Sequence, residues 1–165
     1  MSFSAVPQYT FNCITDISVA FINQLGIKFL MLDLDNTIAA YDESSPADEI
    51  MHWLSEIRNC GVELFIISNS RRKVRVDAFA KTLGITSVNN ARKPSPKAVL
   101  QAMDTAGFSA DNSALAGDQV FTDTLAANRA GIISIIVRPR KCTNLFLSLR
   151  YALETPFRAA CKNKM

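Results

Sequence analysis

Two aspartates one residue apart, Asp33 and Asp35, follow an apolar stretch in the string Asp-Leu-Asp-Asn-Thr. At the end of a strand both carboxylates can reach one site. One can then attack a substrate or bind a metal while the other exchanges a proton. Aspartates are also ordinary turn residues, so the pair alone leaves a structural interpretation open. The longer string over residues 33–37 favours a catalytic or metal-binding role for the pair over a purely structural turn.

Two further polar groups follow other apolar stretches. Ser68 and Asn69 supply a hydroxyl and an amide that can donate to a phosphate oxygen, although such a pair also makes a good turn. Lys93, followed by Pro94, can act as a fixed countercharge, although a single lysine usually lies on the surface.

A second acidic group comes late in the chain, where Asp118 follows Gly117 and Asp123 lies five residues further on. Hard carboxylate oxygens near Asp33 would suit Mg²⁺, which takes one or two carboxylates together with water and substrate phosphate. Whether Asp123 binds the metal directly is left open by its position near the start of a helix.

The elements that must position these groups are five short apolar runs alternating with longer amphipathic ones. This pattern predicts an α/β fold, a three-layer Rossmann-like domain with a five-stranded parallel sheet. Active sites of such folds lie beyond the carboxyl ends of the strands, where all four polar groups fall. The predicted strands are Lys28 to Asp33, Val62 to Ser68, Thr86 to Asn89, Ser113 to Gly117 and Ile132 to Val137.

Helix signals lie between these runs. Ser45 and Ser95 each precede a proline, which predicts a serine cap and a proline at the first helical position. Four glycines stand where helices should end: Gly61, Gly84, Gly107 and Gly131. A helix over Ile14 to Leu25 is expected to pack on the sheet.

Length and composition predict one domain over residues 1–165, with a helical extension at 1–27 and a basic amphipathic tail at 138–165. The 165 residues include four cysteines, widely spaced and without a Cys-x-x-Cys pair. A zinc ribbon or a redox dithiol is therefore not expected, and a reducing cytosol is the simpler setting.

Charge is divided unevenly along the chain. Residues 1–137 hold 11 Lys and Arg against 14 Asp and Glu, a net charge of −3, whereas residues 138–165 hold 7 against 1, a net charge of +6. Such a tail either meets an anionic partner, membrane or nucleic acid, or is simply solvated.

The tail also carries apolar residues at helical spacing, Leu145, Phe146, Leu149 and Leu153, before Pro156, which we expect to end the helix. These side chains can insert into a membrane or pack back on the domain; packing back is the slightly favoured interpretation. We see no stretch of roughly 18 to 20 apolar residues and no signal peptide, so we expect a cytoplasmic protein, with peripheral membrane contact as an option.

A second basic group, Arg71, Arg72, Lys73 and Arg75, follows Asn69 and by default forms a solvated face. Nucleic-acid binding is not expected, because these positive charges lack interleaved aromatic residues and the body of the protein is acidic.

Taken together, the motifs Asp-Leu-Asp-Asn-Thr, Ser-Asn, Lys-Pro and Gly-Asp-Gln-Val-Phe-Thr-Asp resemble, in order, those of the haloacid dehalogenase-like phosphatases. The resemblance covers about the central two thirds of the chain. It implies that Asp33 is the nucleophile that becomes an aspartyl-phosphate, and that Asp35 protonates the leaving group and later activates water. It also implies that Ser68 binds the phosphoryl group with Asn69 beside it, and that Lys93 neutralises charge. Mg²⁺ would be bound by Asp33, Asp118 and the backbone carbonyl of Asp35.

The second acid, Asp35, favours a phosphatase within that superfamily. Short spacings between the motifs leave no room for a cap domain, so only the loop from Ile38 to Ser45 could shield the site. An open site suits a large or surface-bound substrate, or a pocket completed by a neighbouring subunit in a homo-oligomer.

A finer resemblance is to the capless subfamily IIIA and its YqeG-like branch, which includes phosphatidylglycerophosphate phosphatases. It is carried by Gly26-Ile27-Lys28, by Ala91-Arg92-Lys93-Pro94 and by Asn128-Arg129-Ala130-Gly131, together with the motifs above. Ser70 departs from the branch's usual Ser-Asn-Asn. The branch implies a lipid phosphate substrate such as phosphatidylglycerophosphate.

Other functions compete with this one. A phosphosugar or phosphoprotein is the alternative substrate. A catalytically silent binding module and a receiver-like phospho-acceptor domain are alternative classes. The complete set of motif residues argues against a silent binding module. Asp35 and the order of the motifs argue against a receiver-like domain.

Overall fold

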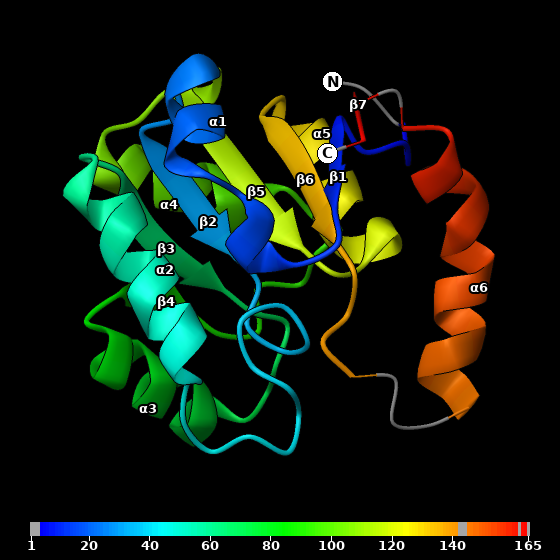
Figure 1. The fold of residues 1–165 in the computed structure, drawn as a ribbon, viewed down its shortest axis with the longest axis horizontal. Helices are drawn as coiled ribbons and strands as arrows, with labels where there is room; N and C mark the ends of the chain where they lie inside the picture. Colours follow the sequence, from blue (N-terminus) through cyan, green and yellow to red (C-terminus); the bar gives the residue numbers. More distant parts are fainter. Residues whose placement is uncertain (1–3, 142–144, 162, 165) are drawn as a thin grey trace.

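A seven-stranded parallel sheet organises the computed structural model, which describes residues 4–141, 145–161 and 163–164 (Figure 1). Its strand order is β4-β3-β2-β5-β6-β1-β7, and neighbouring strands pair in parallel. The strands are β1 (Tyr9–Phe11), β2 (Phe29–Leu32), β3 (Glu63–Ile67), β4 (Thr86–Val88), β5 (Ser113–Gly117), β6 (Ile133–Val137) and β7 (Asn163–Lys164). The central strands β2 and β5 are buried along their whole length, as expected for a sheet covered on both faces.

All five predicted strands are present, and the predicted strand number was too low. In the described residues the sheet gains β1 and β7 at the β6 edge, with Tyr9 opposite Ile135 and opposite Asn163. Both strands are very short, so they lack the period-two pattern that identifies a strand in sequence. Their pairing depends on segments more than 100 residues apart.

Helices cover both faces of the sheet, which confirms the three-layer fold (Figure 1). One face packs on α1 (Val19–Gln24), α2 (Asp48–Asn59) and α3 (Lys73–Leu83), and the other packs on α4 (Lys97–Ala106) and α5 (Leu125–Ala130). Alternate residues of β2 pack against opposite helix layers. Leu30 and Leu32 pack in the core on the side of α1, α2 and α3, and Phe29 and Met31 pack in the core on the side of α4 and α5.

Several helix ends differ from the predicted ones. The expected helix from Ile14 to Leu25 is divided into a 3₁₀ turn (Ile14–Asp16) and α1, because Ser18 accepts a hydrogen bond from the Phe21 N–H and begins a new helix. Neither predicted serine directly precedes its helix, since Ala47 precedes α2 and Pro96 precedes α4. The Ser95 hydroxyl nevertheless accepts a hydrogen bond from the Lys97 N–H, the first of α4, at 3.4 Å. A second 3₁₀ turn, Ala110–Asn112, precedes β5.

The glycine positions were predicted more accurately. Gly84, Gly107 and Gly131 end α3, α4 and α5 in the left-handed conformation, and Gly61 follows the end of α2.

The last helix, α6 (Leu145–Ala159), lies at the side of the sheet (Figure 1) and corrects two expectations. Pro156 lies inside the helix and does not end it. The carbonyl that Pro156 cannot bond belongs to Ala152, which is exposed and can bond water. The four apolar tail residues do not pack on the domain, since Leu145, Phe146, Leu149 and Leu153 are 58–85% exposed.

Within the described residues, no helix is long and apolar enough to span a bilayer.

The carboxyl ends of β2, β3, β4 and β5 meet at one edge of the sheet. Beside this edge the described residues place the connecting segments and α6, whose Arg150 reaches Asp118 at the end of β5. The longest of these connecting segments, residues 33–47, links β2 to α2 and includes the predicted shielding loop.

Candidate active site

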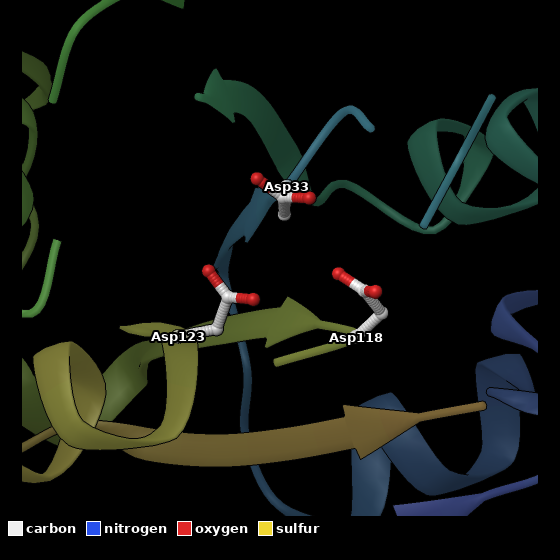
Figure 2. Close-up of side chains that lie close together, drawn as sticks. All are labelled: Asp33, Asp118 and Asp123. Carbon is white, nitrogen blue, oxygen red and sulfur yellow. The ribbon is translucent and has the colours of Figure 1, made fainter. Parts of the chain in front are cut away.

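Three buried carboxylates gather at this edge, those of Asp33, Asp118 and Asp123. Figure 2 shows their side chains pointing toward a shared space, Asp33 from the end of β2 and Asp118 from the end of β5. One oxygen of each lies within 4.8 Å of the others. Such a group of hard oxygen ligands has the composition of a magnesium site.

Asp123 reaches this space because the chain after β5 forms a π-helical turn, Val120–Thr124. Its carboxylate accepts a hydrogen bond from the Gln119 N–H at 3.0 Å, which fixes the side chain toward β5. A Cβ atom on Gly117 would lie 2.3 Å from the Asp123 Cγ atom. Glycine is therefore required at position 117 for Asp123 to occupy this place.

Lys93 lies among these carboxylates. Its ammonium nitrogen is 2.7 Å from Asp33 Oδ1 and 2.6 Å from Asp123 Oδ1, and it donates to the Ile67 carbonyl at 2.7 Å. The side chain is 1% exposed. This places the lysine in the cluster and excludes the solvated alternative.

Asn69 holds the Lys93 backbone in place. Its amide nitrogen donates to the Lys93 carbonyl at 2.9 Å, and its amide oxygen accepts from the Lys93 N–H at 2.8 Å. Both ends of the predicted phosphate-binding amide are thus used within the protein. The neighbouring Ser68 is buried, and its hydroxyl oxygen accepts a hydrogen bond from the Ser70 N–H at 3.0 Å.

Burial and crowding change the acidity of the cluster. Burial raises the pKa of Asp33 to about 7; the Lys93 charge opposes this rise and the Asp123 charge adds to it. Burial also raises the pKa of Asp118 well above its ordinary value, with Asp33 and Asp123 contributing. Burial lowers the pKa of Lys93, but the charges of Asp123 and Asp33 outweigh this effect and raise it. Lys93 therefore remains an ammonium group.

The residues present fit a divalent cation. Three carboxylates share the cluster with one ammonium group, and the buried Oδ1 atom of Asp118 has no hydrogen-bond partner in the described residues. Asp33 and Asp123 both pair with Lys93, and the second oxygen of each accepts a hydrogen bond, from the Thr37 hydroxyl at 3.3 Å and from the Gln119 N–H at 3.0 Å respectively. Asp118 Oδ1 is therefore the carboxylate oxygen of the cluster with neither an ion pair nor a hydrogen bond in the described residues, while Asp33 and Asp123 both hold the Lys93 ammonium.

Asp35 pairs with Arg75, whose Nε lies 3.2 Å from Asp35 Oδ1. The guanidinium also donates to the carbonyls of Ala40, at 2.7 Å, and Glu43. The default interpretation of the basic group was therefore wrong for Arg75, whose side chain is 14% exposed. Its sequence neighbours gave no signal that distinguished it from Arg71 or Arg72.

An open pocket of about 270 Å³ lies above the cluster. It is lined by Asp33, Asp35, Tyr41, Ser68, Asn69, Ser70, Gln119 and Arg150. The sequence alone did not identify Tyr41, Gln119 or Arg150 as residues that line this pocket. Burial, followed by the charges of Asp118, Asp35 and Asp33, raises the pKa of Tyr41, so its hydroxyl is a donor at neutral pH.

The tail contributes to this site through α6. The Arg150 Nη2 atom lies 3.4 Å from Asp118 Oδ2. The Arg158 guanidinium donates to the carbonyls of Asp118 and Val137, the latter at 2.9 Å, and pairs with Glu154 at 3.1 Å. Two basic residues of the tail thus face the acidic body and not solvent.

Comparison with known proteins agrees with the resemblance that the sequence motifs carry. A sequence model described as haloacid dehalogenase-like hydrolase matches residues 13–131. The chain is 31% identical over 127 residues to "Probable phosphatase YqeG" of Bacillus subtilis (strain 168), covering 77% of this chain and 73% of that protein.

Solved structures share the fold at lower sequence identity. One is the 3-deoxy-D-manno-octulosonate 8-phosphate phosphatase of Moraxella catarrhalis, in complex with magnesium, phosphate and KDO. It has a TM-score of 0.58 and 21% identity, and the match covers 90% of this chain and 82% of that one. Another is a putative HAD family hydrolase from Streptomyces avermitilis, with a TM-score of 0.60 and 17% identity over 85% of this chain and 76% of that one.

Proposed function

Because the chain belongs to the haloacid dehalogenase-like hydrolase family, we propose that it is a Mg²⁺-dependent phosphatase that hydrolyses phosphate monoesters. The observation that carries this proposal is the buried carboxylate cluster. In it Lys93 contacts Asp33, and the Oδ1 atom of Asp118 has no hydrogen-bond partner among the described residues. The name of the Bacillus subtilis relative supports the same reaction.

In the proposed reaction Asp33 attacks the phosphorus atom, and the bond from phosphorus to the leaving oxygen breaks. Asp35 gives its proton to that oxygen, so an alcohol leaves and Asp33 carries the phosphoryl group. Asp35 then takes a proton from a water molecule that attacks phosphorus, and the bond to Asp33 breaks to release inorganic phosphate.

Other groups would stabilise charge during these steps. Asp33, Asp118 and the backbone carbonyl of Asp35 would hold Mg²⁺, which supplies positive charge for the phosphoryl oxygens when bound. The Lys93 ammonium is close enough to Asp33 to neutralise the same oxygens. Ser68, which lines the pocket, would bind a phosphoryl oxygen, and Asn69 would keep Lys93 in position through its two hydrogen bonds to the Lys93 backbone.

A lipid phosphate such as phosphatidylglycerophosphate is the proposed substrate. The pocket is open, and α6 carries an exposed row of four apolar side chains beside a residue that lines this pocket, Arg150. A helix with such a row can lie in a membrane interface, and each nearby Lys or Arg adds about 1 kcal/mol on an anionic bilayer. Among the basic residues before α6, Arg138 is exposed, whereas Arg140 pairs with Glu49 and Lys141 pairs with Asp42.

Phosphate release from phosphatidylglycerophosphate in mixed micelles, compared with release from an aryl phosphate, tests both parts of the proposal. We expect activity that requires Mg²⁺, that favours the lipid, and that falls about 10³-fold or more in Asp33→Asn. Asp104→Asn, an exposed aspartate of α4, is the matched control and should retain activity.

The outcomes separate the reaction from the substrate. Activity of Asp33→Asn equal to that of the control would overturn the nucleophile. Activity on the aryl ester without activity on the lipid would leave the reaction standing and overturn the lipid substrate.

A further inference from the structure

Arg150 has an unusual place among the residues that line the pocket. Seven of the eight lining residues are acidic or uncharged, and Arg150 is the cationic one. It reaches the pocket from α6, outside residues 13–131 that match the family. The pocket therefore receives its positive lining charge from a part of the chain that the family match does not cover.

The guanidinium of Arg150 is incompletely bonded. In the described residues it has one contact, 3.4 Å long, to Asp118, and its Nε atom is buried without a hydrogen-bond partner. Arg75 on the opposite side of the pocket differs, because its Nε, Nη1 and Nη2 atoms all donate to the protein. A buried donor without a partner is costly unless a ligand satisfies it.

The helix that carries Arg150 is held firmly against the site. Arg158, two turns further along α6, bonds the backbone carbonyl of Asp118, and Glu154 accepts from the Phe121 N–H at 3.5 Å. The rings of Phe121 and Phe157 meet edge to face with centroids 5.4 Å apart. These contacts fix the backbone from which Arg150 extends, which reduces the freedom that the side chain would lose on binding an anion in the pocket.

From these observations we infer that Arg150 is a specificity-determining residue that binds an anionic group of the substrate other than the phosphate being removed. The inference rests on the proposed function. There Mg²⁺ bound to Asp118 would replace the contact between Arg150 and this carboxylate, which would leave the guanidinium free to bind an anion. Arginine binds phosphate and carboxylate oxygens through two parallel hydrogen bonds, which suits a phosphodiester or a carboxylate near the reacting group.

Two soluble substrates that differ in this one feature test the inference. Deacylated phosphatidylglycerophosphate carries a phosphodiester beside its phosphate monoester, whereas glycerol 3-phosphate presents the same glycerol monoester without the diester. A third substrate, 3-phosphoglycerate, replaces the diester with a carboxylate and so distinguishes the two anion sources. The kcat/KM value of each is measured with Mg²⁺ for wild type, Arg150→Ala, Arg150→Lys and the control Arg138→Ala.

We expect wild type to favour a substrate with a second anion. Arg150→Ala should lower kcat/KM for that substrate about ten- to a hundred-fold more than for glycerol 3-phosphate, mainly through KM. Arg150→Lys should recover part of the difference, since it restores the charge but not the paired geometry. Arg138→Ala should leave the ratio of the substrates unchanged.

An equal loss on all three substrates in Arg150→Ala would overturn the inference, because Arg150 would then act on the reacting phosphate or on Asp118. A wild-type enzyme that is active with Mg²⁺ but has no preference for a second anion would overturn it as well. Absence of Mg²⁺-dependent hydrolysis of every phosphate ester tested would instead contradict the proposed function on which the inference rests.

Discussion

The Asp33 carboxylate is held between opposing electrostatic influences. Burial favours its protonated form, while the Lys93 ammonium 2.7 Å away favours the charged form that would attack phosphorus. A nucleophile with this balance is poised near neutral pH, and a bound divalent cation would move the balance further toward the carboxylate.

This balance predicts how the stability of the metal-free protein depends on pH. Asp33 has an ordinary pKa of 3.8 when unfolded and about 7 when folded, so between these values the folded state binds more protons. Its contribution therefore becomes less favourable as the pH rises from about 4 to 7, by up to about 4 kcal/mol. Asp33→Asn cannot ionise and should lose less stability over this range.

Thermal unfolding with a chelator present, at a series of pH values, measures the effect. The Tm of Asp33→Asn should rise relative to wild type as the pH increases from 4.5 to 7.5. Adding Mg²⁺ at pH 7.5 should raise the Tm of wild type more than that of the variant. Parallel Tm curves for the two proteins would contradict the pKa assigned to Asp33.

Among the elements, the connection over residues 33–47 depends most on one distant side chain. Arg75, at the start of α3, joins Asp35 to the carbonyls of Ala40 and Glu43 and lies with its guanidinium 4.7 Å from the centre of the Phe79 ring. The arginine thus fixes the loop that carries both Asp35 and the pocket residue Tyr41.

Removing Arg75 should loosen this connection. Arg75→Ala is expected to lower the free energy of unfolding by about 1.5–3 kcal/mol and kcat/KM for an aryl phosphate by about ten-fold or more. Limited proteolysis should cut residues 38–45 faster than in wild type. The exposed Arg71, four residues earlier, provides the control: if Arg71→Ala and Arg75→Ala behave alike, the loop does not depend on Arg75.

At the scale of the whole molecule, α6 has two unlike faces. Leu147, Glu154 and Arg158 are buried against the domain, whereas Leu145, Phe146, Leu149 and Leu153 are exposed. The buried face explains why the helix adjoins the active site, and the exposed face has the character of a membrane-binding surface.

These two faces can be separated by substitution. Leu149→Gln combined with Leu153→Gln should change Tm little, because both side chains are about 60% exposed. The same change should weaken sedimentation with anionic vesicles and lower activity on the lipid, but not on a soluble ester. Unchanged vesicle binding would show that the exposed row is not a membrane surface, and a large fall in Tm would show that it supports the fold.

Some whole-molecule expectations stay predictions. They include the extent of a single domain over residues 1–165, a cytoplasmic location, a homo-oligomer and the absence of nucleic-acid binding.

Local sequence pattern was enough to predict five strands of the sheet and to bring the candidate site residues to one edge of it. Five short apolar runs alternating with longer amphipathic ones predicted five strands, because strands buried on both faces of a sheet are largely apolar. Parallel strands bring their carboxyl ends to one edge, so placing Asp33, Ser68, Lys93 and Asp118 together required only the strand assignments.

Only the tertiary structure decided which arginines belong to the site and how the sheet ends. Arg75, Arg150 and Arg158 look like surface charges in sequence, and their roles arise from contacts 32–40 residues away. The edge strands β1 and β7 likewise pair with segments that no local pattern identifies. The physical reason is the same in each case: a charge or a short strand acquires its partner only when distant parts of the chain have packed.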